Sequence, residues 1–189
     1  MSAQDSKLFV ISGPSGAGKG TLVTRVRERR SNLGLTVSAT TRAPRNGEVD
    51  GVNYFFLTRE EFDRRVANGE FVEWAEVHGN CYGTLVSEVE SKLASGSSLI
   101  LEIDVQGALQ VKERFPEAVL IFIKPPSLEV LRERLVGRGT ETPETIELRM
   151  ANAADELALA DRYDDVVVND DLDRATDELV RVLDMHERI

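Results

Sequence analysis

Cysteine is almost absent from this chain of 189 residues, because Cys81 is its only one. No disulfide can therefore form within the chain, and nothing in it resembles a set of zinc ligands. Long hydrophobic runs are also lacking at the start, where the apolar run at residues 8–11 follows a polar segment. That run is too short for a signal-peptide core or a membrane span. We therefore expect a cytoplasmic protein without a membrane partner.

Basic residues are outnumbered, since 23 Lys and Arg stand against 33 Asp and Glu and give a formal net charge of −10. A surface with this charge repels phosphate backbones, so we expect no nucleic-acid partner. A site for an anionic substrate must then gather its basic residues locally. Hydrophobic residues make up 41% of the chain, which is enough at this length for one globular unit with a substantial core.

Continuous apolar segments alternate with helical patterns along the chain. Strands are predicted at residues 8–12, 99–103, 118–124 and 165–169, and helices at 19–30, near 107–115 and toward His186. Strands that are apolar throughout are typical of a parallel sheet covered by helices on both faces. The fold class is therefore α/β, with a three-layer core formed by residues 7–34, 91–126 and 161–189.

Two stretches depart from this pattern. Residues 35–90 contain shorter strand patterns at 53–57 and 71–77, and they predict a small α+β insertion with antiparallel pairing. A helix between these strands is predicted to begin at Thr58, with Glu61 completing a capping box, and to end at Asn68. Residues 127–160 are predicted to form a helical lid that breaks around Gly137 and restarts at Thr142.

The segment Gly13-Pro-Ser-Gly-Ala-Gly18-Lys19 matches the first seven positions of the P-loop pattern, between a predicted strand and a predicted helix. Its glycines let backbone N–H groups turn toward an anion, and Lys19 can reach the β- and γ-phosphates of a nucleotide. The last Ser or Thr of the pattern, which usually contacts Mg²⁺, is Gly20 here, followed by Thr21. Adenylate kinases share this ending, so phosphoryl transfer is possible without that hydroxyl. Ordered water could replace it as a contact of the metal.

A P-loop alone leaves GTPases, ATPases and small-molecule kinases open. The segment from Asp104 to Gly107 satisfies a GTPase-like Asp-x-x-Gly, but no Asn-Lys-x-Asp motif follows it, which disfavours a switch GTPase. Arg42 and Arg45 supply the local basic concentration that an anionic substrate needs in an acidic protein. Their guanidinium forks suit a monophosphate dianion, whereas two exposed loop arginines are the alternative interpretation.

Further polar residues point to recognition of a base. The hydroxyls of Tyr54 and Tyr82 could add donors to the same phosphate. Guanine presents N1–H and N2–H₂ side by side, and the carboxylate of Glu73 could accept both, whereas adenine offers an acceptor at N1. Glu102 and Asp104 end a predicted strand at the edge where ligands of parallel sheets gather. Metal-water binding or substrate contact is indicated for both, with helix capping as the alternative for Asp104.

These motifs together resemble the guanylate kinase family from about residue 7 to residue 187. The matching segments are 12–19, 38–45, 47–48, 70–74, 82–84, 102–107, 137–142 and 168–171. Thr84 and Glu102 stand where other members carry Ser and Asp. The resemblance implies Mg²⁺-dependent transfer of the γ-phosphoryl of ATP to GMP or dGMP, giving ADP and GDP. No residue is assigned as a ligand of Mg²⁺, which phosphates and water would mainly hold.

The resemblance also implies a role for each matching site residue. The ATP site would comprise Gly13, Pro14, Ser15, Gly16, Ala17, Gly18, Lys19, Gly20, Thr21, Arg134, Arg138 and Asn169. The GMP site would comprise Ser38, Arg42, Arg45, Tyr54, Glu73, Tyr82, Thr84, Glu102, Asp104 and Arg149. The catalytic set would be Lys19, Arg42, Arg138 and Arg149.

Two alternatives to this function stay open at the level of sequence. One is a nucleoside monophosphate kinase for another base. The other is a guanylate-kinase-like module that binds peptides without catalysis, although such modules typically lose the P-loop and lid residues that this chain keeps. Both a monomer and a homo-oligomer are compatible with the sequence.

Overall fold

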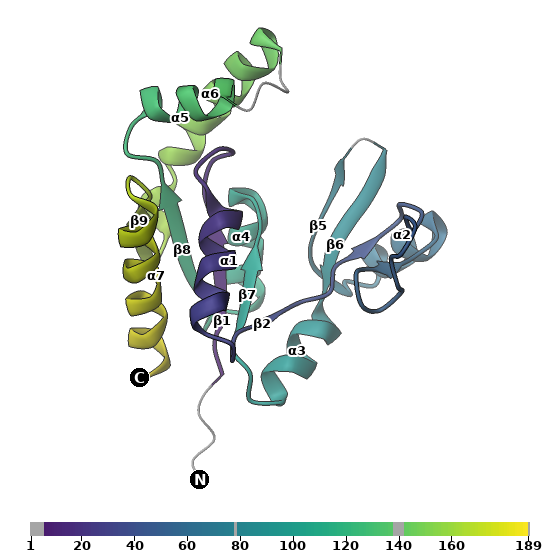
Figure 1. The fold of residues 1–189 in the computed structure, drawn as a ribbon. Coiled ribbons are helices and arrows are strands. Elements are labelled where there is room, and N and C mark those ends of the chain that lie inside the picture. Colours follow the sequence, from purple (N-terminus) through teal and green to yellow (C-terminus); the bar gives the residue numbers. More distant parts are fainter. Residues whose placement is uncertain (1–5, 78, 138–141, 189) are drawn as a thin grey trace.

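A five-stranded parallel sheet forms the core of the computed structural model, which describes residues 6–77, 79–137 and 142–188 (Figure 1). The strand order is β2-β7-β1-β8-β9, so the first strand of the chain lies in the middle. The strands are β1 (Leu8–Ser12), β2 (Gly34–Leu35), β7 (Leu99–Glu102), β8 (Val119–Lys124) and β9 (Asp165–Val168). The four predicted core strands are therefore confirmed, whereas β2, with only two residues, was not predicted.

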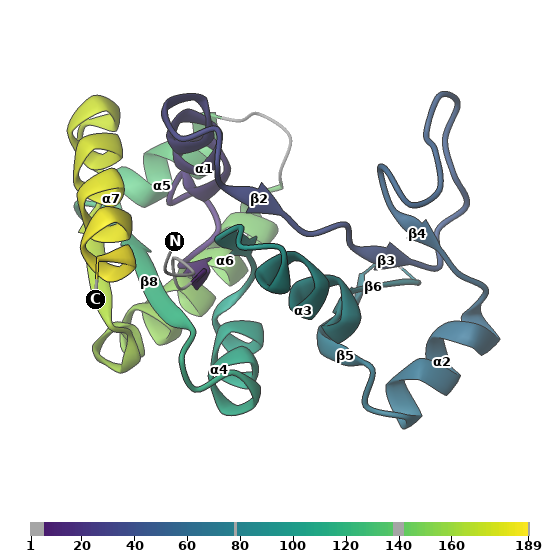
Figure 2. The same ribbon diagram turned by 90° about the horizontal axis from the view of Figure 1, so that it is seen from below.

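Helices cover both faces of this sheet, as predicted (Figure 2). Alternate residues of β1 point to opposite faces. Phe9 and Ile11 pack with α1 (Lys19–Arg29) and α7 (Leu172–Glu187). Leu8 and Val10 pack with α4 (Val105–Arg114) and α3 (Val86–Ala94). Both faces of β1 are buried, which is why its sequence is apolar at every position.

A row of ion pairs joins α1 to α7 across the outer surface of one helical layer. Arg25 pairs with Asp173, and Arg29 pairs with Asp177. Arg30 reaches Asp184 at 2.9 Å and Glu187 at 2.5 Å, and its side chain is only 12% exposed. These ion pairs hold α1, the helix that begins at Lys19, against α7.

Four strands between residues 39 and 85 form a second sheet that projects to one side of the core (Figure 1). Its strands are β3 (Ala39–Thr40), β4 (Phe55–Phe56), β5 (Phe71–Val77) and β6 (Asn80–Leu85), in the order β4-β3-β6-β5. The expected antiparallel pairing holds for β5–β6 and β3–β6, but β3 and β4 are parallel. The expectation was wrong for β4 because the long connection between residues 41 and 54 lets the chain return in the same direction.

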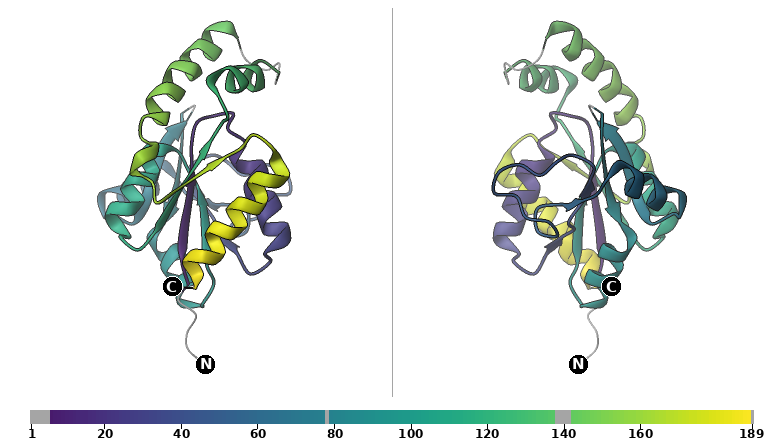
Figure 3. Two further views of the ribbon diagram at one scale, coloured as in Figure 1. Left: turned by 90° about the vertical axis from the view of Figure 1, so that its left-hand side faces the viewer. Right: turned by 90° about the vertical axis from the view of Figure 1, so that its right-hand side faces the viewer.

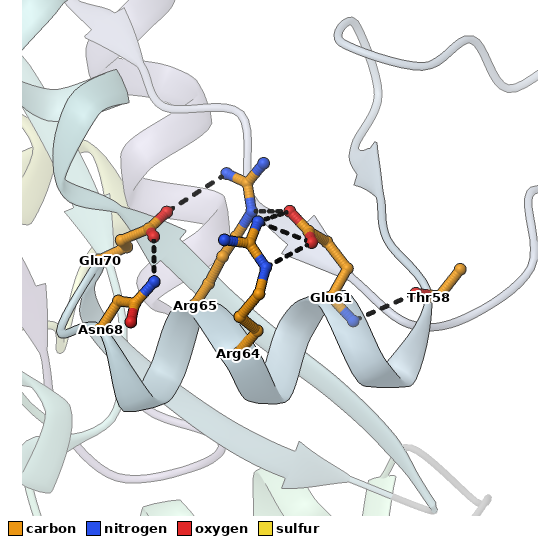
Figure 4. Close-up of polar contacts among 6 residues, drawn as sticks. All are labelled: Thr58, Glu61, Arg64, Arg65, Asn68 and Glu70. Carbon is orange, nitrogen blue, oxygen red and sulfur yellow. Dashed lines mark hydrogen bonds and ion pairs between the residues drawn. The ribbon is translucent and has the colours of Figure 1, made fainter.

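The helix α2 (Arg59–Ala67) links β4 to β5, and it has the predicted ends at Thr58 and Asn68. The amide of Glu61 donates to Oγ1 of Thr58 at 3.1 Å, which is one half of the predicted capping box. The Glu61 carboxylate instead binds the guanidinium groups of Arg64 and Arg65 (Figure 4). In a complete capping box this carboxylate would accept from the backbone N–H of Thr58. Charge-assisted hydrogen bonds from the two arginines replace that bond.

The helices α5 (Leu128–Gly137) and α6 (Pro143–Leu157) form a pair at the end of the core opposite the C-terminal end of α7 (Figure 3). Leu131 and Leu135 of α5 pack against Ala153 of α6. Thr142 caps α6 by accepting from the amide of Thr145, as predicted. A short 3₁₀ helix (Ala160–Arg162) then leads to β9. The division of the chain at residues 35, 90, 127 and 160 stays a prediction, and α3 runs across residue 90.

Candidate active site

The phosphate loop, residues 13–18, connects the buried strand β1 to the first turn of α1, where the sequence places it. Gly18 has a φ of +90°, and a Cβ built on it would lie 2.4 Å from Nδ2 of Asn169. Only glycine accepts this conformation and this contact without strain. The Lys19 ammonium donates to the carbonyl oxygens of Gly13 at 2.6 Å and Pro14 at 3.1 Å. The ammonium of Lys19 therefore lies against the loop that is expected to bind the phosphates.

Gly20, the departure from the P-loop pattern, faces Glu102 at the end of β7. A Cβ on Gly20 would lie 3.5 Å and 3.6 Å from the two carboxylate oxygens of Glu102. The space that a serine or threonine hydroxyl would take in the P-loop pattern is thus next to a carboxylate. Burial raises the pKa of Glu102, and the positive charge of Lys19 partly opposes that rise. The structure brings together the three predicted residues Lys19, Gly20 and Glu102.

One cavity of about 460 Å³ opens beside the loop, on the side of α5 and β9. It is lined by Gly16, Gly18, Thr21, Arg134, Gly137, Asn169, Asp170 and Leu172. Five of these belong to the predicted ATP site. Nδ2 of the buried Asn169 donates to the carbonyl of Ala17 at 2.7 Å, and Arg134 donates to the carbonyl of Asn169 at 2.8 Å. Asn169 therefore supports the loop itself, a contact for which the sequence carries no signal.

The arginines predicted for the lid have different outcomes. Arg149 of α6 donates to Oγ of Ser15 in the loop at 2.5 Å, so the structure brings this residue to the phosphate loop. Arg134 lines the cavity just described. Arg138 lies outside the described residues, and its predicted role in the catalytic and ATP sites stays a prediction.

A second cavity, of about 500 Å³, lies between α1, the end of β7 and the 35–90 insertion. Its walls include eight residues of the predicted sites, namely Gly20, Ser38, Tyr54, Glu73, Tyr82, Thr84, Glu102 and Asp104. Thr24 and Arg27 of α1 also line it and were not predicted. They follow Gly20 by four and seven residues, a spacing that places all three on one face of the helix. This spacing could have predicted them from the sequence.

Glu73 is the carboxylate that the insertion contributes to this second cavity. The hydroxyl of Thr84 on the neighbouring strand donates to Oε1 of Glu73 at 2.8 Å. Burial raises the pKa of Glu73, the bond from Thr84 opposes this, and the charge of Asp104 adds to the rise. Asp104 also accepts from the amide of Gly107 at 2.7 Å, so it caps α4 and lines the cavity at once. The capping interpretation is therefore confirmed, whereas contact of Asp104 with substrate or metal-bound water stays a prediction.

The two arginines of the insertion do not line this cavity but lie on the loop beside its rim. The guanidinium carbon of Arg42 lies 5.4 Å from the centre of the Tyr54 ring and 5.9 Å from that of Phe56. Nη2 of Arg42 contacts both carboxylate oxygens of Glu48, at 2.9 Å and 3.0 Å. Arg45 follows on the same loop and is connected to Glu48 through its backbone amide. Sequence analysis gave Glu48 no role in the site.

Across the described residues, no helix is both long and apolar enough to span a bilayer. Comparison with known proteins relates this chain to one family. The family model described as guanylate kinase matches residues 5–186. A guanylate kinase from Gloeobacter violaceus is 57% identical over 178 residues, which cover 94% of this chain and 87% of the relative.

Further relatives agree with this match. One from Halalkalibacterium halodurans, also a guanylate kinase, is 51% identical and covers 97% of this chain and 90% of the relative. The crystal structure of guanylate kinase from Anaplasma phagocytophilum has a TM-score of 0.72 at 36% identity, covering 97% of this chain and 87% of the other. The family model and these relatives show that the chain belongs to the guanylate kinase family.

Proposed function

We propose that this protein is an ATP:GMP phosphotransferase that moves the γ-phosphoryl of ATP to GMP, or to dGMP, and releases ADP and GDP. The observation that carries the proposal is the pair of cavities that both border the start of α1, one at Thr21 and the other at Gly20. One is lined by Arg134 and Asn169, and the other holds the carboxylate of Glu73. A donor and an acceptor nucleotide bound in them would meet at Lys19.

In this proposal Glu73 reads guanine. Its carboxylate offers acceptors to N1–H and N2–H₂ of the base, and the bond from Thr84 fixes its orientation. AMP presents an acceptor where guanine presents N1–H, so with AMP the part of the carboxylate that faces the base would lack a donor. This favours GMP over AMP by the rule that unpaired buried polar groups are costly. A kinase for another base does not fit this carboxylate.

The reaction requires little covalent chemistry from the protein. A phosphate oxygen of GMP, already anionic at neutral pH, forms a bond to the γ-phosphorus of ATP. The bond from that phosphorus to the bridging oxygen breaks, and ADP leaves with the electron pair. No general base is needed, because the nucleophile carries no proton that must be removed. Lys19, Arg42 and Arg149 would position the reactants and stabilise the negative charge that spreads in the transition state.

The residues around Gly20 fit a magnesium ion bound together with ATP. Mg²⁺ prefers hard oxygen ligands and keeps several waters, and Glu102 presents a carboxylate beside the glycine. When bound, the ion would neutralise part of the negative charge of the phosphates. Glu102 would hold its water shell, where other P-loop proteins use a hydroxyl. Thr21 lines the cavity on the ATP side and supplies a further oxygen nearby.

The proposal assigns residues 35–90 to GMP binding and residues 127–160 to a lid that closes over both nucleotides and excludes water. Arg149 and Arg138 would carry the positive charge of that lid. We also propose that the protein works in the cytoplasm with nucleotides as partners. Its net charge of −10 opposes binding to nucleic acid or to an anionic membrane.

A coupled assay of ADP release tests the proposal, with ATP, Mg²⁺ and each of GMP, dGMP, AMP, CMP and UMP. We expect turnover with GMP and dGMP and little with the other three. Absence of turnover with GMP would overturn the enzymatic function and favour a non-catalytic binding module. Equal rates with GMP and AMP would instead overturn the role of Glu73.

A further inference from the structure

The guanidinium of Arg42 is held on several sides before any substrate binds. Nη2 donates to both oxygens of Glu48, at 2.9 Å and 3.0 Å, and Nη1 donates to the carbonyl of Ala43 at 2.8 Å. The rings of Tyr54 and Phe56 lie near it at cation–π distances. The side chains of Arg42 and Glu48 are only 15% and 19% exposed. Although Arg42 lies on a loop, its guanidinium is thus held by hydrogen bonds and largely shielded from solvent.

The same carboxylate also fixes the backbone of the second arginine. Oε2 of Glu48 accepts from the amide of Arg45 at 2.7 Å, and the amide of Glu48 donates to the carbonyl of Arg45 at 3.1 Å. These two bonds close a turn that passes through Gly47, whose φ is +86°. One residue therefore sets where Arg42 points and where the backbone carrying Arg45 lies.

Charge and donor number decide what this arrangement can do. The Arg42 guanidinium lowers the pKa of Glu48, followed by the backbone bond from Arg45, so Glu48 stays ionised at neutral pH. A guanidinium has five N–H groups. The bonds to Glu48 and Ala43 use at most three of them, and a side-chain interaction with Tyr82 uses at most one more. At least one N–H group of Arg42 therefore remains for a phosphate. A fixed carboxylate could either hold Arg42 ready for a phosphate or compete with that phosphate for it.

We propose that Glu48 is a positioning residue for the phosphate of the acceptor nucleotide. It orders Arg42 and the turn at Arg45 in advance, so that the ordering is not required when the substrate binds. Its contacts with Arg42 involve Nη2, which leaves other donors in place, and for that reason we assign it support rather than competition. The inference rests on the proposed function, since it takes GMP as the molecule whose phosphate is bound.

Binding of GMP and of guanosine to Glu48→Ala, measured by isothermal titration calorimetry, tests this role. Guanosine has the same base and sugar but no phosphate, so it does not depend on the two arginines. We expect the dissociation constant of GMP to rise on the order of tenfold, because a charged, preordered contact becomes mobile. The constant of guanosine should change by less than about twofold, within the noise expected of a distant surface substitution.

Glu61→Ala is the matched control. Glu61 is a glutamate of the same insertion that also binds two arginines, but these are Arg64 and Arg65 of α2 and not the two arginines proposed to bind the phosphate (Figure 4). It should leave both dissociation constants unchanged. Glu48→Gln keeps a side-chain oxygen for Arg42 and Arg45, so it should restore part of the GMP affinity and remains informative should the alanine variant fold poorly.

Three results would overturn the proposal. Tighter GMP binding by Glu48→Ala would show that Glu48 competes with the phosphate. Equal losses for GMP and guanosine would show that the loop is merely structural, and unchanged binding of both would show that Glu48 has no role. Wild-type binding of GMP tests the proposed function, whereas the ratio of variant to wild type tests Glu48 alone. A wild type that binds no GMP overturns both.

Discussion

Replacing Glu73 with glutamine tests the recognition of the base with almost no change in shape. The carboxylate of Glu73 accepts from the Thr84 hydroxyl at 2.8 Å and is expected to accept from two adjacent N–H groups of guanine. In Glu73→Gln one acceptor oxygen becomes an NH₂ donor, and the remaining oxygen loses its charge. A donor then faces a donor in a half-buried wall of the cavity.

The size of the effect follows from two parts. Loss of a hydrogen bond to a charged acceptor costs about 1.5–3 kcal/mol, and an unsatisfied buried donor costs about 1–3 kcal/mol more. The sum, about 2.5–6 kcal/mol, corresponds to roughly 10²–10⁴-fold weaker GMP binding. The lower end applies where the glutamine rotates so that its NH₂ donates to Thr84 and its oxygen still faces the base.

The same carboxylate predicts a pH dependence. Because burial raises the pKa of Glu73, it takes up a proton at a higher pH than an ordinary carboxyl, whose value is 4.5. Protonation removes an acceptor, so affinity for the base is complete above the raised pKa and falls as pH decreases through it. Guanosine is the suitable ligand for this measurement, since the phosphate of GMP titrates in a nearby range. In Glu73→Gln this dependence should disappear.

Isothermal titration calorimetry with GMP, guanosine and AMP provides the assay, and thermal unfolding confirms that the variant is folded. We expect weak GMP binding and little change for AMP. A Glu73→Gln variant that binds GMP within about threefold of wild type, less than 1 kcal/mol, would refute the assignment of Glu73 to guanine.

Three further substitutions test other parts of the molecule. Lys19→Met should abolish turnover in the ADP-release assay while the melting temperature stays close to wild type, and retained turnover would remove Lys19 from the catalytic set. Gly18→Ala places a Cβ 2.4 Å from Nδ2 of Asn169 at a φ of +90°, so ATP binding should weaken by roughly tenfold or more, and wild-type affinity in calorimetry would contradict this. Phe62→Ala removes a fully buried ring stacked 4.4 Å from that of Phe71, and urea unfolding should show a loss of about 3–5 kcal/mol. A loss below about 1 kcal/mol would mean that the insertion closes the cavity left by the ring.

Much of the core could be predicted from sequence because its signals are local. The residues of β1 are apolar at every position, and the glycines and lysine that follow allow few alternatives to a phosphate loop. The predicted limits of β1 and β5 agree with the structure to the residue. Short strands such as β2 and β3, with two residues each, have no periodicity and could not be found.

Contacts between distant segments could not be predicted. The resemblance places Asn169, Ala17 and Gly18 in one ATP site, but nothing in the sequence indicates that Asn169 donates to Ala17 and crowds Gly18. Glu48 belongs to a matching motif, but its function depends on a turn that brings its carboxylate back to Arg42. The residue types of the site were therefore predictable, whereas the supports that hold them depend on tertiary geometry.

The central position of β1 has a consequence for the order of folding during synthesis. β1 leaves the ribosome before either of its neighbours, and its partner in β7, which pairs Phe9 with Ile100, follows much later. Until its neighbouring strands have been synthesised, β1 has no partners for its backbone N–H and C=O groups, and its apolar side chains are not yet covered. Such late pairing slows folding and favours contact with chaperones. Asn169, Asp170 and Leu172, which follow β9, supply part of the wall of the cavity beside the phosphate loop. A nucleotide bound in this cavity would therefore stabilise only those chains in which β9 and the residues after it have already folded onto the loop.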